Sequence, residues 1–256
     1  MMVISLWPST WRSSDMRKLI IFFSLFMTAS LLCAYDFPVH NGKITASFGS
    51  RIRGEFNTGI DIETDDVIAS EAGEVLYYGD DLVAIAHKDN ILTIYSGISV
   101  SETVSKDFHI KKGQFLGKTK KGVLHFAVYD LEMERYINPL LMTEAVKKSE
   151  LPRVKGLSYD ESQGLLSVQL EDKGLLGLYR VQVSAGGQVV CTLGFRTIQR
   201  KGDTLLLEGF TCSALYSRQG AVSFPGIHLN QGINNIDVIV TDFYGKKVEF
   251  HGRITV

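Results

Sequence analysis

Residues 44–62 read ITASFGSRIRGEFNTGIDI. Short apolar runs in this stretch are separated by glycine, serine and asparagine, which favour tight turns. The same alternation extends from Phe37 to about Ala145, with apolar runs at 67–69, 73–78, 82–87, 91–95, 113–119 and 123–129. Runs of this length between turn residues predict β-strands.

The chain after residue 150 repeats this pattern. Ala185-Gly186-Gly187-Gln188 predicts a hairpin turn, and residues 242–245 predict another turn. Apolar runs lie at 165–170, 178–184, 189–193, 204–207, 236–241 and 246–256. We therefore predict an all-β protein whose second half is a β-sandwich.

The composition excludes two classes of function. The 256 residues are 45% hydrophobic and 21% charged, which is typical of a folded chain and not of a disordered one. Lys and Arg number 27 and Asp and Glu number 28, so the formal net charge is -1. A chain without a basic excess is not expected to bind nucleic acid or an anionic membrane surface.

The N-terminal residues predict secretion. Met16-Arg17-Lys18 is a short basic head, and the apolar run from Leu19 to Leu32 is too short to span a bilayer. We interpret residues 1–34 as a secretory signal peptide with Met16 as the true start. Two processing routes stay open, cleavage after Ala34 or lipidation of Cys33. The protein is expected in the periplasm or cell envelope, with membrane contact only through a lipid at Cys33.

A polar stretch divides the two halves. Residues 146–152 end in Leu151-Pro152 and predict a linker between a domain at 37–145 and a domain at 153–256. The second domain contains Cys191 and Cys212. In an oxidising compartment these cysteines form a disulfide, or they stay as two buried free thiols, and the sequence leaves both alternatives open.

A series of motifs gives the first domain a more specific character. The opening stretch resembles the first motif of the lysostaphin/LytM-type zinc endopeptidases, which cut peptide cross-links in bacterial cell walls. Further segments resemble that family in the same order, at residues 71–75, 111–117, 124–126 and 137–139. The resemblance covers about residues 37–142 and implies a LytM-type β-sheet core.

The family's site is altered in this sequence. The resemblance places the three zinc ligands at Asn57, Asp61 and His125, and an asparagine is a poor zinc ligand. It places the family's two other site histidines at Gly97 and Val123, neither of which can transfer a proton. The resemblance therefore implies a peptidase fold without peptidase activity and without bound zinc.

Several residues have simpler alternatives. Asp61 could pair with Arg51 or Arg53, and His125 could be an ordinary cleft histidine. A zinc site with atypical ligands would have to recruit a histidine such as His87 or His109. The pair Tyr77-Tyr78 could line a groove that stacks on sugar or peptide, or it could pack at a strand edge.

The C-terminal half loosely resembles bacterial immunoglobulin-like sandwiches, on residues 229–236 and 238–242. Such a domain implies a spacer or a docking surface. We predict a catalytically inactive cell-envelope protein that binds peptidoglycan or a cell-wall hydrolase, as amidase-activator members of the family do. One alternative is an active zinc endopeptidase with atypical ligands, and another is a surface adhesion or structural protein.

Overall fold

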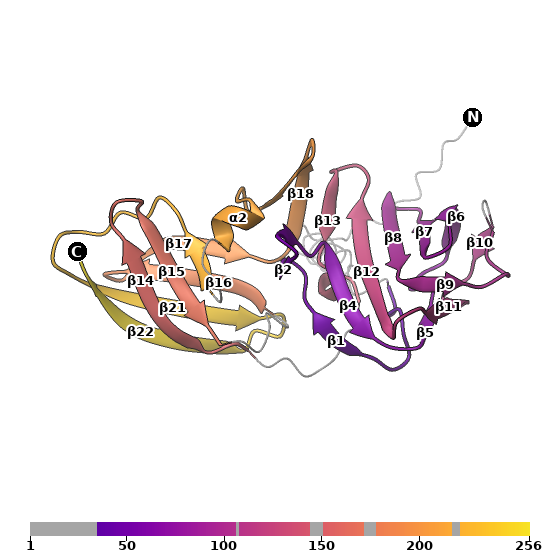
Figure 1. Ribbon diagram of the computed structural model, residues 1–256, viewed down its shortest axis with the longest axis horizontal. Coiled ribbons are helices and arrows are strands. Elements are labelled where there is room, and N and C mark those ends of the chain that lie inside the picture. Colours follow the sequence, from indigo (N-terminus) through magenta and orange to yellow (C-terminus); the bar gives the residue numbers. More distant parts are fainter. Residues whose placement is uncertain (1–34, 106–107, 144–150, 172–177, 217–220) are drawn as a thin grey trace, which may run out of the picture. The chain divides into compact units, whose positions relative to one another are not determined.

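The computed structural model describes residues 35–105, 108–143, 151–171, 178–216 and 221–256 (Figure 1). The predicted signal peptide, with Met16 and Cys33, lies outside the described residues, as do residues 146–150 of the predicted linker. Residues 35–256 form one compact unit. A search of the described residues for a long apolar helix that could cross a membrane finds none.

The described chain is built of antiparallel strands, which confirms the predicted all-β class. The largest sheet has the strand order β10-β6-β7-β8-β12-β13-β18-β19, and β4 pairs with both β12 and β1. Its ten strands are β1 (Lys43–Ala46), β4 (Gly59–Glu63), β6 (Gly73–Tyr78), β7 (Leu82–Ala86), β8 (Ile91–Ser96), β10 (His109–Ile110), β12 (Val123–Asp130), β13 (Arg135–Ile137), β18 (Thr197–Lys201) and β19 (Thr204–Leu207).

Alternating burial explains why these segments form strands. On β8, every second residue is buried, and Tyr95 is fully inaccessible to solvent. Its ring packs against that of Phe126 on β12, with 5.2 Å between the ring centroids. A second sheet has the order β5-β11-β9, and a short hairpin is separate from both sheets; their strands are β5 (Asp66–Ile68), β9 (Ile98–Val100), β11 (Phe115–Thr119), β2 (Arg51–Ile52) and β3 (Glu55–Phe56).

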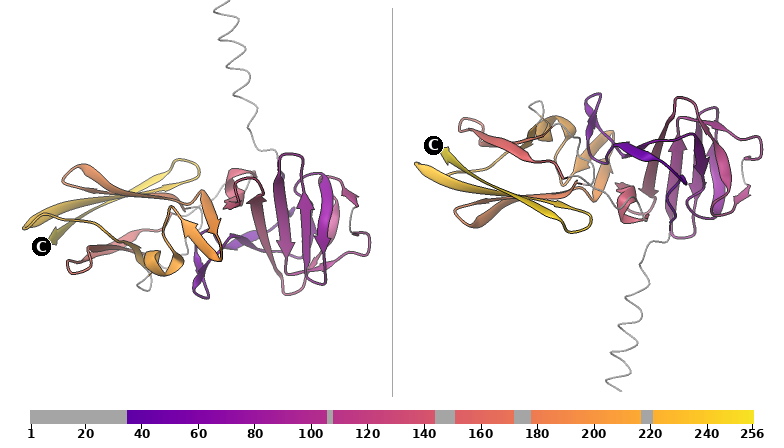
Figure 2. Two further views of the ribbon diagram at one scale, coloured as in Figure 1. Left: turned by 90° about the horizontal axis from the view of Figure 1, so that it is seen from above. Right: turned by 90° about the horizontal axis from the view of Figure 1, so that it is seen from below.

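Two further sheets form a sandwich in the C-terminal part, and Figure 2 shows their two layers. Buried side chains such as Val168, Phe224, Val183 and Val238 fill the space between them. The first sheet contains β14 (Val154–Asp160), β15 (Leu165–Leu170) and β20 (Ala221–Phe224), and the second contains β16 (Leu178–Ala185), β17 (Gln188–Gly194), β21 (Ile233–Asp242) and β22 (Lys247–Thr255).

Both predicted turns of the sandwich are confirmed. Gly186 and Gly187 join β16 to β17 with positive φ angles of 56° and 81°, the conformation that a two-residue hairpin with the right twist needs. Asp242 accepts hydrogen bonds at its Oδ1 from the backbone N–H groups of Tyr244 (2.9 Å) and Lys246 (2.8 Å). An aspartate that caps a turn in this way holds β21 and β22 in register.

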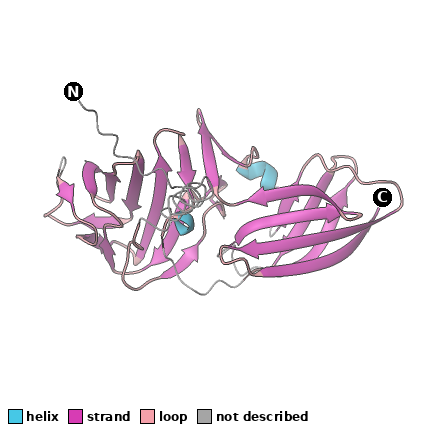
Figure 3. Cartoon of the chain, turned by 180° about the vertical axis from the view of Figure 1, so that it is seen from behind, coloured by secondary structure: helices cyan, strands magenta, loops and turns pink. Residues whose placement is uncertain are grey.

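Strands β18 and β19 extend the large sheet although they lie in the C-terminal half of the sequence (Figure 1). β18 pairs with β13, so that Ile198 faces Tyr136, and Ile198 is fully buried. Figure 3 shows how little of the described chain is helical: η1 (Pro139–Leu141) and α2 (Cys212–Leu215) are its two helical turns. The large sheet therefore contains strands from both sides of residue 150.

Candidate functional site

Two neighbouring strands bring Asp61 and His125 together. Asp61 on β4 lies directly opposite His125 on β12. The Asp61 Oδ1 atom lies 2.7 Å from His125 Nδ1, and the side chains are 23% and 33% exposed. At this distance the imidazole Nδ1–H donates to the carboxylate, so each group already has a strong partner.

A glycine makes this pairing possible. A Cβ atom on Gly59, the first residue of β4, would lie 2.2 Å from the carbonyl oxygen of Phe126 on β12. Only a residue without a side chain allows the two backbones to approach this closely. Gly59 thereby sets the register that places Asp61 against His125.

Asn57 occupies the third predicted ligand position, immediately before β4. It is 4% exposed, and its side-chain Oδ1 accepts a hydrogen bond from the N–H of Gly59 at 3.2 Å. Its Nδ2 is buried and has no partner among the described residues. The amide oxygen that would have to face a metal is therefore engaged by the chain's own turn.

These three residues do not fit a catalytic zinc ion. Such an ion needs three protein donors aimed at one point and an open position for water. Here Asp61 and His125 are bonded to each other, and Asn57 offers a neutral oxygen that is already hydrogen-bonded. Across the described residues, no group of three or more His, Cys, Asp or Glu side chains is placed to hold a metal.

Gly97 and Val123 lie at the other two predicted site positions. Gly97 follows β8 with a φ of +80°, and a Cβ there would lie 2.9 Å from the carbonyl oxygen of Val123. Val123 begins β12, two residues before His125, so the two side chains point to the same face of the strand. With 38% of its surface exposed, Val123 presents an apolar side chain beside His125.

The alternative partners proposed for Asp61 lie elsewhere. Arg51 donates from Nη1 to the backbone oxygen of Tyr216 at 2.9 Å, and Asp61 forms its ion pair with His125. The interpretation that Asp61 pairs with Arg51 or Arg53 is thus wrong in this structure. The β4–β12 register places His125, and not an arginine, directly opposite Asp61.

The structure also shows where His87 and His109, the two histidines considered as replacement zinc ligands, lie. His87 contacts the carbonyl oxygen of Ala72 at 2.8 Å through Nδ1 and Thr93 Oγ1 at 2.9 Å through Nε2. Burial lowers the pKa of His87, against the opposing effects of the Ala72 carbonyl and of Asp89 and Glu71. His109 is exposed on β10, opposite Glu74. Both ring nitrogens of His87 are thus engaged away from Asp61.

The sequence did not predict a contact between the loop that precedes Asn57, which contains Gly49, and Tyr216 in the C-terminal part. Tyr216 donates from its hydroxyl to the backbone oxygen of Gly49 at 2.7 Å, and its ring lies edge-on to Phe56, with 6.2 Å between centroids. Burial raises the pKa of Tyr216 above its ordinary value, so the hydroxyl keeps the proton that it donates. Gly49 and Asn57 are joined in turn, since the Gly49 N–H donates to the Asn57 carbonyl at 2.8 Å.

No local sequence pattern could have revealed this contact, because its two residues are 167 positions apart.

Nor does the sequence settle the state of the cysteines. Cys191 and Cys212 are both free thiols; Cys212 is buried as the second alternative expected, whereas Cys191 is half-buried. Partial burial raises the pKa of each thiol. Tyr77 and Tyr78 on β6 are exposed to 55% and 46%.

Comparison with known proteins agrees with the fold of the first domain. The model of peptidase family M23 matches residues 55–139, and a second family model, without a functional description, matches residues 158–256. No curated protein matches the sequence.

Among solved structures, Csd3 of Helicobacter pylori is 24% identical over 46% of this chain and 37% of its own, with a TM-score of 0.38. The SpoIIQ–SpoIIIAH pore-forming complex matches at 21% identity over 44% of this chain and 92% of that chain, with a TM-score of 0.37. A zinc-containing peptidase from Vibrio cholerae matches at 21% identity over 37% of this chain and 36% of its own, with a TM-score of 0.33. Likenesses at these scores say nothing of activity or partners. The family model matches the region that holds Asn57, Asp61 and His125, so residues 55–139 are similar to peptidase family M23.

Proposed function

We propose that this protein is a catalytically inactive M23-type protein of the cell envelope, which binds peptidoglycan or a cell-wall hydrolase at the surface around Asp61, His125 and Val123. The observation that carries the proposal is the direct 2.7 Å contact between Asp61 and His125. Two groups that would share a metal in an active site satisfy each other here, and Asn57 is turned onto Gly59.

The chemistry of this surface supports binding rather than hydrolysis. Amide hydrolysis by a metallopeptidase needs a metal to activate water and positioned groups to move protons. Gly97 and Val123 supply no such group. This surface presents an apolar side chain, Val123, beside a polar pair, Asp61 and His125. A surface of that kind suits contact with a peptide or a protein, which offers both apolar and hydrogen-bonding groups.

A first experiment measures zinc by elemental analysis on purified residues 35–256. We expect less than about a tenth of an equivalent, because a tight zinc site needs a third strong donor. The control is the Asp61→Ala, His125→Ala double variant, which should give the same low value. Nearly one equivalent in the unchanged protein, lost in the double variant, would refute the proposal and favour an active zinc endopeptidase.

A second experiment measures binding directly, by co-sedimentation with purified cell walls and by capture of purified cell-wall hydrolases. Val123→Glu should abolish the interaction because it places a charge on the apolar part of this surface. The matched control is Val189→Glu on β17, since Val189 is also exposed, at 57%. Absence of binding to walls and to hydrolases by the unchanged protein would disprove the proposal.

A further inference from the structure

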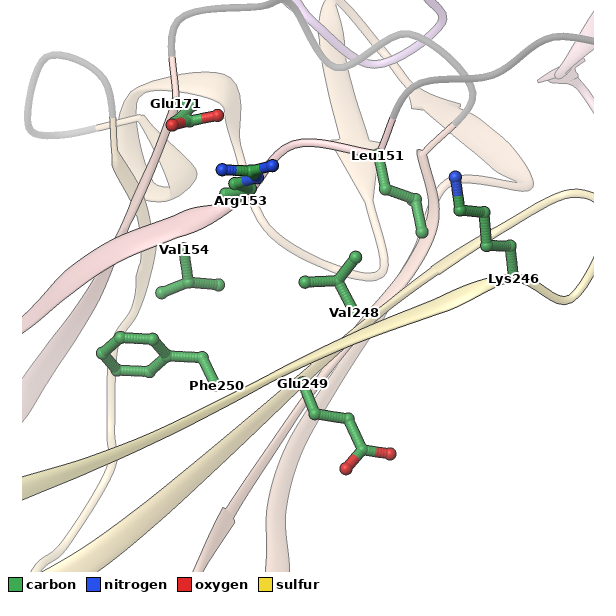
Figure 4. A pocket seen from close by; sticks show the side chains of 8 residues that line it. All are labelled: Leu151, Arg153, Val154, Glu171, Lys246, Val248, Glu249 and Phe250. Carbon is green, nitrogen blue, oxygen red and sulfur yellow. The ribbon is translucent and has the colours of Figure 1, made fainter.

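A cavity of about 500 Å³ lies in the C-terminal sandwich, far along the sequence from the M23 domain (Figure 4). Its walls come from β14 and β22, which are edge strands of the two facing sheets. The volume falls within the range of about 300–1,000 Å³ that is usual for small-molecule sites. Half-buried Val154, Val248 and Phe250, with buried Leu151, form its apolar part.

Charged side chains stand at both ends of this apolar part. Figure 4 shows Arg153 and Glu171 at one end and Lys246 at the other. The Glu171 N–H donates to the Arg153 carbonyl oxygen at 2.8 Å, which fixes the two residues side by side. Glu249 also borders the cavity, with its carboxylate directed away from the Arg153 end.

These charges are not used within the described part of the chain. The ion pairs formed there involve other residues, and none includes Arg153, Glu171 or Lys246. Arg153 and Lys246 are exposed and Glu171 is half-buried, so all three can pair with a ligand in the cavity, and charge-assisted hydrogen bonds to them would favour a ligand of matching charge. The ligand should therefore carry a cationic and an anionic group close together at one end, and a second anionic group at the other end.

An amino-acid head group meets the first requirement. Its carboxylate suits the guanidinium of Arg153, and its ammonium group suits the carboxylate of Glu171. A second carboxylate suits Lys246, and an aliphatic chain between the two ends suits Val248 and its neighbours. A wholly anionic ligand would meet Glu171, and a wholly apolar one would leave three charges unmatched.

We propose that this cavity binds a peptidoglycan stem peptide that ends in diaminopimelate. Diaminopimelate is a diamino diacid: its side chain ends in a carbon that carries both an ammonium and a carboxylate group, and its main chain ends in a second carboxylate. This inference rests on the proposed function, because that function brings the protein to the cell wall. It adds a separate ligand site, in a different part of the chain.

The test titrates residues 35–256 with the soluble tripeptide L-Ala-γ-D-Glu-meso-diaminopimelate by calorimetry. A tripeptide with L-Lys in the last position is the matched ligand, since lysine keeps the ammonium but lacks the second carboxylate. We expect the diaminopimelate peptide to bind at least tenfold more tightly. Equal affinities, or no binding of either peptide, would overturn the proposal.

Variants then locate the site. Lys246→Met should weaken binding of the diaminopimelate peptide about tenfold, and Arg153→Met should remove the preference over the lysine peptide. Lys247→Met is the control, because Lys247 is the exposed neighbour of Lys246 and does not line the cavity. An equal loss in Lys247→Met would show that net charge, and not this cavity, determines binding.

The outcome also separates this inference from the proposed function. If the protein sediments with cell walls, loses that property in Val123→Glu and binds neither peptide, the cavity assignment fails and the proposed function stands. If it binds the peptide through Lys246 but Val123→Glu changes nothing, the cavity assignment stands and the assignment of binding to the surface around Val123 fails.

Discussion

Asp61 and His125 satisfy each other across two paired strands. They lie directly opposite each other on β4 and β12 and bond at 2.7 Å. A catalytic zinc ion would need a third strong donor aimed at the same point, and Asn57 offers only a neutral amide oxygen that is already hydrogen-bonded. The pairing gives the Asp61 carboxylate a hydrogen-bond donor, which it needs because its side chain is only 23% exposed.

Restoring the third ligand should restore metal binding but not catalysis. Asn57→His places an imidazole at the third position, and we expect zinc affinity to rise at least tenfold, which corresponds to about 1.4 kcal/mol. Cross-link cleavage should stay absent because Gly97 and Val123 are unchanged. Competition with a chromogenic chelator measures the affinity. The double variant Asn57→His, His125→Ala is the control, and an unchanged affinity in the single variant would contradict this account of the site.

His87 should make the stability of the protein depend on pH. Burial lowers its pKa below the ordinary 6.5, so the unfolded chain takes up a proton more readily than the folded one. The stabilisation is complete above the unfolded pKa of about 6.5 and is lost as the pH falls from there through the folded pKa.

Urea unfolding at a series of pH values checks this. The free energy of unfolding should fall below about pH 6.5, and His87→Gln should flatten that fall. Exposed His40, changed to Gln, serves as the control. An equally steep fall in His87→Gln would assign the pH dependence to other groups.

At the scale of elements, the site depends on how closely β4 approaches β12. The five paired positions from Val123 opposite Glu63 to Ala127 opposite Gly59 give the register. A shift by one residue would turn Asp61 to the other face of the sheet, because side chains alternate along a strand. The close approach at Gly59 excludes that shift.

Gly59→Ala should therefore destabilise the protein strongly. The new Cβ would lie 2.2 Å from the Phe126 carbonyl oxygen, so β4 or β12 must move, and we expect a loss of at least about 2 kcal/mol. Gly156→Ala on β14 is the matched control, since its nearest neighbour, Gln169 Oε1, lies 3.6 Å away. Chemical denaturation compares the two variants. Similar losses in both would mean that the close approach is not what sets the register.

At the scale of the whole molecule, the C-terminal half contributes directly to the sheet that holds Asp61 and His125. The β18–β19 hairpin extends the large sheet beyond β13, and Asn138 donates from Nδ2 to the Phe195 carbonyl at 2.8 Å. Gly49 packs so closely that a Cβ there would lie 2.7 Å from the Phe195 ring. The loop that leads to Asn57 is thus held by residues far along the sequence.

Tyr216→Phe tests that support. The change removes one hydroxyl and leaves the buried Gly49 carbonyl without this donor, which should cost about 1–3 kcal/mol. Amide exchange at Gly49 should also speed up, because its N–H donates to Asn57 in the same loop. Tyr78→Phe, at a 46% exposed tyrosine, is the control for loss of a hydroxyl. Equal stability of the two variants would show that the contact does not hold the loop.

The sequence by itself determined the strands, the turns at Gly186-Gly187 and Asp242, and the similarity of residues 55–139 to peptidase family M23. These features depend on neighbouring residues, because alternation and turn chemistry act over a few positions. The sequence also singled out Asn57, Asp61 and His125 by their motif positions, and the strand pairing brings Asp61 and His125 together. Only the tertiary structure decided that Asp61 bonds His125 rather than an arginine, and that Tyr216 reaches Gly49. Such contacts depend on strand register and on chain segments that meet only after folding, and local sequence does not encode those distances.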